Sequence, residues 1–337
     1  MKKTTAAWLA APLAGAGLLT WAFQSAPYDI LPDGCARINL SGRIRLNITR
    51  RLMPLMRVAQ KLRKKPQQPV RLIEHHTVPT SYGPAPVTLY WPETTTDAPL
   101  PVYINFHGGG FVLGYPAQDD LLCRYLAHEV QCLVVNVDYV LAPEYPFPAA
   151  VEQSYEVVRW VQAHARTWGQ IATERLAIGG HSAGAGISAA IALLNKERQE
   201  LSLALQLLDY PPTNLAQKGR RKHVLDRKQV LTPKLTAFFK HLYIPCPDDY
   251  ANPLASPLLA PDVRDLAPAL IITADHDLLR DEGVAYAEKL RQAGVQVQHQ
   301  NFLGVDHAFT HFGPEEQARA AWDLMRDALR KALGVGQ

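Results

Sequence analysis

The sequence predicts an α/β fold in which a mostly parallel central sheet is covered by helices on both faces. Short apolar runs with strand character alternate with longer segments that favour helix, which is the pattern of parallel strands joined by crossover helices. The composition, 47% hydrophobic and 20% charged, is ordinary for a globular protein and excludes a disordered chain. Without internal repeats or low-complexity tracts, the 337 residues fit one domain with extra segments.

The expected strands are short and rich in aliphatic residues, as buried parallel strands are. In chain order they occupy 102–106, 132–137, 176–179, 203–208, 270–274 and 295–302. An earlier run at 86–91 is expected to add an antiparallel strand at one edge of the sheet.

The expected helices lie between these strands, at 118–130, 152–168, 183–199, 280–293 and 314–333. The last one has a clear amphipathic period, because its large apolar side chains recur on one stripe and its charged side chains lie off that stripe. The apolar stripe contains Trp322, Met325, Leu329 and Leu333, and the charged residues are Arg319, Asp323, Arg326 and Arg330. We expect this helix to cover the core.

One candidate catalytic motif is Gly180-His181-Ser182-Ala183-Gly184, which follows the strand-like run at 176–179. Glycines two positions before and after a serine allow a sharp turn from strand to helix that exposes the hydroxyl. Since a helix begins after this turn, the amide of Ala183 has no partner within the helix and favours negative charge. The motif predicts that Ser182 is a nucleophile.

A second motif, His107-Gly108-Gly109-Gly110, comes directly after the strand-like run at 102–106. Glycines let backbone amides approach a ligand without obstruction by side chains. Gly108 and Gly109 are therefore the candidate donors that, together with Ala183, stabilise an oxyanion. The two motifs in combination point to hydrolysis of an acyl ester.

A serine hydroxyl needs a base and an orienting acid, expected further along the chain in the order Ser, acid, His. The candidates are Asp277, just after the strand at 270–274, and His307, just after the strand at 295–302. Asp275 is a rival acid on the same loop. His181 is adjacent to Ser182, but at such a turn its side chain is expected to point away from the hydroxyl.

From about residue 85 to 335 the chain resembles the bacterial hormone-sensitive lipase family (family IV) of α/β-hydrolase carboxylesterases. Besides the two glycine motifs, the resemblance rests on 138–144, 146–150, 277–283 and 306–309. It implies an α/β-hydrolase fold with a helical cap, the catalytic triad Ser182, Asp277 and His307, and an oxyanion hole formed by Gly108, Gly109 and Ala183. His107, Gly110, Gly180 and Gly184 would support these motifs, His107 in a structural role.

The chain departs from the family pattern at three positions near these motifs. His181 replaces the usual acid or threonine, Ala185 replaces a glycine, and Val140 replaces an arginine. None of these changes removes a catalytic group. They do put in doubt whether the family's substrate preference, its pH optimum and any ion pair of that arginine apply to this chain.

The resulting functional prediction is a serine carboxylesterase that hydrolyses short- to medium-chain acyl esters through an acyl-enzyme. A deacetylase or amide deacylase acting on an envelope glycan or small molecule is an alternative, because the serine motif does not distinguish the leaving groups. A non-catalytic ligand-binding protein on the same fold is a further alternative. The expected partner is a small-molecule ester, and no cofactor, metal or nucleic acid is expected: His75-His76 has no ligands at metal-binding spacing, and no aromatic platform for nucleic acid is present.

Two segments, about 28–75 and about 211–250, do not fit the alternation and look helical and apolar-basic. In the resembling family such segments form a cap, which leaves 76–337 as the catalytic domain with an insertion at 211–250. Phe238, Phe239, Leu242 and Tyr243 are candidates to line the cap or simply to pack within it. Residues 34–73 hold eleven Arg and Lys and no acidic residue, which suits either anionic headgroups and polyanions or a solvated cap face.

The N-terminus has Lys2-Lys3 followed by an uncharged stretch from Ala6 to Phe23, so 1–27 is expected to be a signal peptide or a membrane anchor. In either case the catalytic domain is expected outside the cytoplasm, periplasmic or anchored to the membrane, with a cytoplasmic enzyme as the alternative. Of four cysteines, Cys35 and Cys246 both lie in the cap segments and are a candidate disulfide, the alternative being unpaired buried thiols. The oligomeric state stays open, and a homodimer is allowed.

Overall fold

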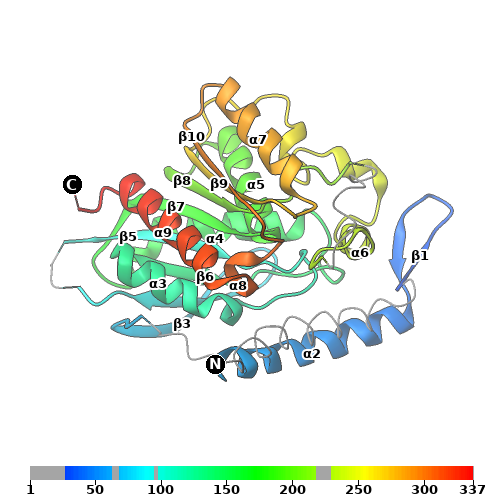
Figure 1. Ribbon diagram of the computed structural model, residues 1–337, viewed down its shortest axis with the longest axis horizontal. Coiled ribbons are helices and arrows are strands. Elements are labelled where there is room, and N and C mark those ends of the chain that lie inside the picture. Colours follow the sequence, from blue (N-terminus) through cyan, green and yellow to red (C-terminus); the bar gives the residue numbers. More distant parts are fainter. Residues whose placement is uncertain (1–26, 63–67, 95–97, 218–228, 337) are drawn as a thin grey trace.

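An eight-stranded sheet forms the centre of the molecule (Figure 1). The computed structural model describes residues 27–62, 68–94, 98–217 and 229–336. The strands lie in the order β10-β9-β8-β7-β5-β6-β4-β3. All pairings from β6 across to β10 are parallel, whereas β4 runs antiparallel to both β3 and β6. The expected mostly parallel sheet is therefore confirmed. The strand bounds are β3 Leu72–Val78, β4 Ala85–Trp91, β5 Leu100–Phe106, β6 Leu133–Val137, β7 Ile171–His181, β8 Leu203–Asp209, β9 Ala269–Ala274 and β10 Val297–Phe302.

The antiparallel strand expected at 86–91 is present as β4, but it does not lie at the edge of the sheet. The edge strand is β3, which the sequence prediction missed and which begins before residue 76, the expected start of the catalytic domain. Its alternating polar residues resemble a surface segment, because only one of its sides is paired. His75 and His76 lie within this strand, and His75 Nδ1 is 3.2 Å from the hydroxyl of Thr88 on β4.

Helices cover both faces of the sheet, and alternate side chains of β5 contact the two layers. Val102 and Ile104 belong to the same core cluster as buried side chains of α4 and α5, whereas Tyr103 packs with α3 and α9. This is the period of two expected for a strand buried on both faces. The helix bounds are α3 Asp120–Val130, α4 Ala149–His164, α5 Ala183–Arg198, α7 Arg280–Gln292, α8 Phe309–Phe312 and α9 Glu315–Ala332. A 3-10 turn, η1 (Pro116–Asp119), precedes α3.

The amphipathic stripe expected at the C-terminus is confirmed in α9. Met325 and Leu329 are fully buried, Leu333 just after the helix is buried as well, and Trp322 is partly buried against the same core. This helix packs beside α3 on one face of the sheet.

The sequence suggested that the N-terminal segment is helical throughout, but only part of it is. It begins with a two-stranded antiparallel hairpin, β1 (Tyr28–Ile30) and β2 (Ala36–Ile38), and continues into the long helix α2 (Leu40–Leu62). Short extended segments around a Pro-Asp-Gly turn favour such a hairpin. Figure 1 shows α2 running along one side of the molecule and the hairpin reaching toward α6 (Pro233–Tyr243).

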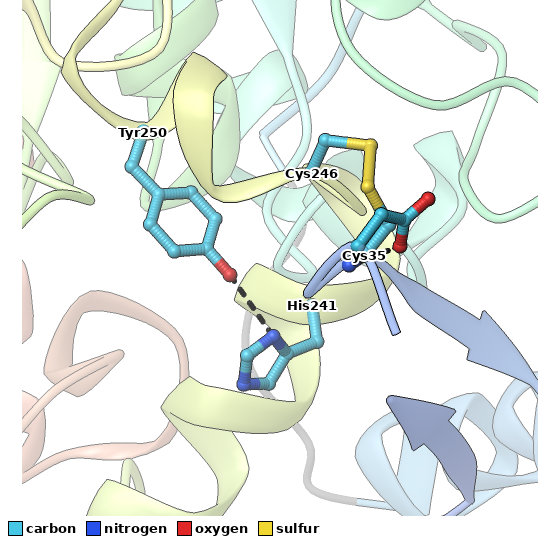
Figure 2. The surroundings of a disulfide bond; sticks show 5 residues. Cys35, His241, Cys246 and Tyr250 are labelled. Carbon is cyan, nitrogen blue, oxygen red and sulfur yellow. Dashed lines mark hydrogen bonds between the residues drawn. A yellow bond between two sulfur atoms is a disulfide. The ribbon is translucent and has the colours of Figure 1, made fainter. Parts of the chain in front are cut away.

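A disulfide joins these two parts of the chain, which are distant in sequence (Figure 2). Cys35 and Cys246 are bonded, with a Cα–Cα distance of 4.3 Å and a sequence separation of 211. Beside it the hydroxyl of Tyr250 is 3.0 Å from Nδ1 of His241. The bridge considered from the sequence is thus present, whereas Cys123 and Cys132 are free and buried.

No helix among the described residues is both long and apolar enough to cross a membrane. The N-terminal stretch predicted to be a signal peptide or anchor lies, apart from Pro27, outside the described residues.

Candidate active site

Ser182 lies between the end of β7 and the start of α5, at the carboxyl edge of the sheet. Its backbone has φ 50° and ψ −115°, an unusual conformation for a residue with a side chain. Its amide donates to the carbonyl of Asp209 at 2.8 Å, which anchors the turn to β8. A Cβ atom at Gly180 or at Gly184 would collide with the carbonyl oxygen of Phe106, so both positions require glycine.

His307 and Asp277 meet Ser182 from the loops that follow β10 and β9. His307 Nε2 is 3.0 Å from Ser182 Oγ, and His307 Nδ1 is 2.7 Å from Asp277 Oδ2. The other carboxylate oxygen of Asp277 accepts the amide of Leu279 at 2.9 Å. The three side chains form a continuous hydrogen-bonded line. Backbone hydrogen bonds hold both partners of the imidazole, Ser182 through its amide and Asp277 through its carboxylate.

The pKa of His307 is raised above its ordinary value. Burial by itself lowers it, because the cation loses hydration, but the charge of Asp277 and the hydrogen bond to it outweigh that effect. Asp306 adds a smaller contribution in the same direction. The site therefore stabilises the imidazolium that forms when the histidine accepts a proton.

The rival acid, Asp275, has different partners. Its carboxylate forms an ion pair with Arg280 at 3.0 Å and accepts the amide of Gly304 at 3.4 Å. It is also more exposed than Asp277, whose side chain is completely buried. Of the two aspartates, Asp277 is the one in contact with His307.

The glycine loop lies beside the serine. A Cβ atom added to Gly108 would be 3.6 Å from Ser182 Cβ, and Gly109 and Gly110 have positive φ angles of 139° and 63°. The carbonyl of Gly108 accepts from Gln118 Nε2 at 3.0 Å, which fixes the loop. Within the described residues, the amides of Gly108 and Gly109 donate no hydrogen bond, so they are available to an oxyanion.

His107 is buried beneath this loop, and its contacts are with the neighbouring backbone and an aromatic ring. Its Nδ1 donates to the carbonyl of Gly108 at 3.0 Å, and its ring stacks on Tyr139 with centroids 4.3 Å apart. The hydroxyl of Tyr139 in turn donates to the carbonyl of His107 at 2.7 Å.

His181 points away from the serine hydroxyl into the protein. Its Nδ1 is 2.9 Å from Asp209 Oδ2, and its Nε2 is 3.9 Å from Asp119 Oδ2. Burial lowers the pKa of this imidazole, but the charge of Asp119 and the hydrogen bond to Asp209 outweigh that effect and raise it. The expectation that His181 is not the base agrees with this geometry.

The sequence prediction missed a polar cluster behind the serine. Asp119, Asp209, Tyr210 and His311 form hydrogen bonds around His181, although the sequence offers no pattern that links them. A partial signal exists: Asp209 ends β8, Asp119 ends η1 just before α3, and His311 follows His307 by one helical turn. Residues at these positions converge at the carboxyl edge of a parallel sheet.

A mostly apolar cavity of about 220 Å³ opens at the serine. Its floor contains the serine, the histidine and the glycine loop, and its walls come from α2, α6 and the segments beside them. The wall residues include Met53, Leu215, Leu231, Leu235, Phe239 and Tyr243. Of the four aromatic and aliphatic candidates on α6, Phe239 and Tyr243 line the cavity, whereas Phe238 and Leu242 are buried in the core and do not.

Comparison with known proteins identifies relatives that are α/β-hydrolases and esterases. A family profile described as the alpha/beta hydrolase fold matches residues 103–311. The chain is 38% identical to the esterase LipI of Mycobacterium tuberculosis over 286 residues, covering 82% of this chain and 88% of that protein. It is 38% identical over 258 residues to the carboxylesterase NlhH of the same species, covering 74% and 78%.

Solved structures of esterases are similar over most of the chain. An esterase from Pyrobaculum calidifontis has a TM-score of 0.77 at 34% identity, covering 85% of this chain and 92% of its own. The carboxylesterase EstE1 from a metagenomic library has a TM-score of 0.79 at 33% identity, covering 86% and 97%.

Proposed function

The chain belongs to the hormone-sensitive-lipase-like family of α/β-hydrolases and is a carboxylic ester hydrolase, and we propose that Ser182, His307 and Asp277 carry out its reaction. The observation that supports this assignment is the hydrogen-bonded line from Ser182 Oγ through both nitrogens of His307 to Asp277. A serine hydroxyl becomes a nucleophile when a base is within reach of its proton and is itself oriented by an acid.

The proposed reaction is a two-step acyl transfer. Ser182 Oγ attacks the ester carbonyl carbon while His307 Nε2 takes the hydroxyl proton, and the tetrahedral intermediate then expels the alcohol, which receives that proton. Water, activated by the same histidine, then hydrolyses the acyl-enzyme. Asp277 holds the imidazole and stabilises its cation through Nδ1.

The amides of Gly108, Gly109 and Ala183 are the proposed donors to the oxyanion. Gly108 and Gly109 are on the loop beside the nucleophile, and Ala183 is the first residue of α5, whose N-terminus carries a partial positive charge. Such donors act on charge that develops only in the transition state, and each is worth about 10²–10³ in kcat.

The acyl-enzyme is tested most directly by covalent labelling of the full chain. A diethyl phosphate ester of p-nitrophenol should add one diethylphosphoryl group, located by mass spectrometry on the peptide that contains Ser182. Ser182→Ala should stay unlabelled and lose about 10⁴-fold or more in turnover of p-nitrophenyl acetate. Labelling of another residue, or an active Ser182→Ala variant, would refute the assignment.

We infer that α2 and α6 form a cap that restricts the enzyme to short- and medium-chain acyl groups. Met53 on α2 and Leu235 and Phe239 on α6 line the cavity at the serine. A Cβ atom at Gly110 would meet the ring of Phe239, so this ring packs directly on the glycine loop. The aromatic side chain thereby limits the space next to the proposed oxyanion donors.

The chain-length proposal is tested with p-nitrophenyl esters from two to sixteen carbons. We expect kcat/KM to peak at short chains and Phe239→Ala to move the maximum to longer chains. Val230→Ala is a suitable control because Val230 borders the same cavity but is 43% exposed. A wild-type maximum at sixteen carbons would contradict the proposal, and the matching p-nitroanilides show whether amides are cleaved as well.

We further propose that the protein is exported, with the hydrolase domain outside the cytoplasm, either periplasmic or anchored to the membrane. The Cys35–Cys246 disulfide supports this location, since disulfides persist mainly in oxidising compartments. The uncharged stretch after Lys2-Lys3 is also typical of an export signal or anchor. Fractionation of cells that express the full chain, with thiol alkylation before mass spectrometry, tests it: cytoplasmic protein with four free thiols would contradict export.

A further inference from the structure

Three side chains converge behind the proposed nucleophile, each from a different element. Asp119 is the last residue of η1, His181 is the last residue of β7, and His311 is on α8. Their candidate ligand atoms, one from each residue, all lie within 4.8 Å of one another. Asp119 and His181 are almost completely buried, and the side chain of His311 is 11% exposed.

Both imidazoles turn the same nitrogen toward the carboxylate. His311 Nε2 is 2.9 Å from Asp119 Oδ1, and His181 Nε2 is 3.9 Å from Asp119 Oδ2. Imidazole nitrogens and a carboxylate oxygen are the usual ligands of zinc and related divalent transition metals. Bonds of about 2.0–2.2 Å in a tetrahedral site separate neighbouring ligand atoms by about 3.3–3.6 Å, so atoms as much as 4.8 Å apart must close by about 1 Å when an ion binds.

The Nδ1 atoms of the two imidazoles are hydrogen-bonded to other side chains, as the non-ligating nitrogens of metal-binding histidines usually are. His181 Nδ1 is 2.9 Å from the carboxylate of Asp209. His311 Nδ1 is 3.0 Å from the hydroxyl of Tyr210 and 3.1 Å from that of Thr310. The carboxylate partner of His181 fixes the tautomer in which Nδ1 carries the proton and Nε2 is available as a ligand. The hydroxyls beside His311 Nδ1 can donate or accept, so they permit the same tautomer in His311 when an ion takes the place of the Nε2 proton.

The centre of this cluster is not fully satisfied by the protein. His181 Nε2 is buried and has no hydrogen-bond partner among the described residues. A buried polar atom without a protein partner is satisfied by a water molecule or an ion, and this one lies beside a carboxylate and a second imidazole. The cavity at the serine is bordered by His181 and His311, which gives an ion a route to the cluster.

We propose that Asp119, His181 and His311 form a binding site for one divalent transition-metal ion of the zinc class. The ion takes Nε2 of both histidines and a carboxylate oxygen of Asp119, and a water molecule from the cavity completes the coordination. Both Nε2 atoms must be unprotonated for this, so binding releases any proton that they carry. The site shares no ligand with the triad, and neither the family profile nor the sequence motifs assign it.

The test uses the full chain, stripped with a chelator and titrated with Co²⁺, whose visible d–d absorption reports coordination by nitrogen and oxygen ligands. We expect saturation at one Co²⁺ per chain, displacement by one Zn²⁺, and loss of the absorption in His311→Gln and Asp119→Asn. Tyr210→Phe removes no ligand but deletes the hydroxyl that contacts His311 Nδ1 and Thr310 Oγ1, and it should weaken binding by about 10–100-fold.

A matched control is His164→Gln, because His164 is an exposed histidine at the end of α4 that is hydrogen-bonded to the carbonyl of Trp160 and is not part of the cluster. It should bind Co²⁺ like the wild type. Circular dichroism and thermal unfolding establish that each variant is folded. If Asp119→Asn fails to fold, His311→Gln decides, because its ring is partly exposed. A wild type that shows no saturable absorption, or equal binding by wild type and His311→Gln, overturns the proposal and leaves a metal-free network of ionised side chains.

Discussion

Arg50 donates to Glu144 at 2.9 Å and so links α2 to the segment that follows β6. The same guanidinium donates to the carbonyl of Val112 from two nitrogens, at 2.9 and 2.8 Å, and to the carbonyl of Ala142. Val112 comes two residues after the glycine triplet, so an N-terminal residue holds the loop that carries the proposed oxyanion donors. Arg50 thus provides an ion pair in a region where the family arginine is replaced by Val140.

We predict that Arg50→Met destabilises the protein and lowers activity. It leaves two buried carbonyls without donors, which should cost about 1–3 kcal/mol in the free energy of unfolding. The displaced glycine loop should reduce kcat/KM by as much as ~10²-fold. Urea unfolding and ester hydrolysis measure the two effects, with the exposed neighbour Arg51→Met as control. Equal values for the two variants would show that Arg50 does not hold the loop.

Asp306 should contribute, after Asp277, to the pH at which activity is lost on the acid side. Its charge raises the pKa of His307, and the base works only when neutral. Asp306→Asn removes that charge, lowers the pKa of His307, and should move the acid limb of kcat/KM to lower pH. Asp275→Asn, whose carboxylate pairs with Arg280, should leave the limb in place. A limb that stays fixed in Asp306→Asn contradicts this electrostatic role.

Asp277→Asn should preserve the fold but reduce kcat on the order of 10⁴-fold. The amide can no longer accept the Nδ1 proton as a carboxylate does, so the imidazole loses its correct tautomer and its counter-charge. Steady-state hydrolysis of p-nitrophenyl butyrate measures the loss. Asp275→Asn on the same loop is the matched control and should retain most of the activity. A larger loss in the control would reverse the assignment of the acid.

Loss of the disulfide should weaken the protein by about 2–4 kcal/mol, because the bridge closes a very long loop and limits the unfolded chain. Cys246→Ser should therefore unfold at lower urea than the wild type. Dithiothreitol should lower the urea midpoint of the wild type to that of the variant, and it should leave the midpoint of the variant unchanged. An effect of reductant on Cys246→Ser would mean that another thiol is responsible.

Much of this molecule could be predicted because its motifs are local. The turn around Ser182 and the glycine loop after β5 each depend on neighbours within a few residues, and buried parallel strands are recognisable as apolar runs. Asp277 and His307 could be named because each directly follows a strand of the same sheet edge.

What the sequence did not predict depends on distant contacts. β3 has polar residues on an edge strand, so its pattern is weak. The hairpin before α2 has a favourable turn, but its strands are very short and it is also held by the segment around Pro245 and Cys246. The partners of His181 come from η1, β8 and α8, three elements separated by many residues. No spacing rule joins them, and only the fold brings them together.

The disulfide divides the covalent chain into a ring and two tails. The ring runs from Cys35 to Cys246 and contains β3 to β8 and the nucleophile, whereas Asp277 and His307 belong to the C-terminal tail. A single proteolytic cut within the ring leaves one covalently connected molecule, but a cut between Cys246 and Asp277 leaves the acid and base attached to the nucleophile only by packing. The disulfide therefore keeps the chain covalently connected after a cut in the part that carries Ser182, but not after a cut between Cys246 and Asp277.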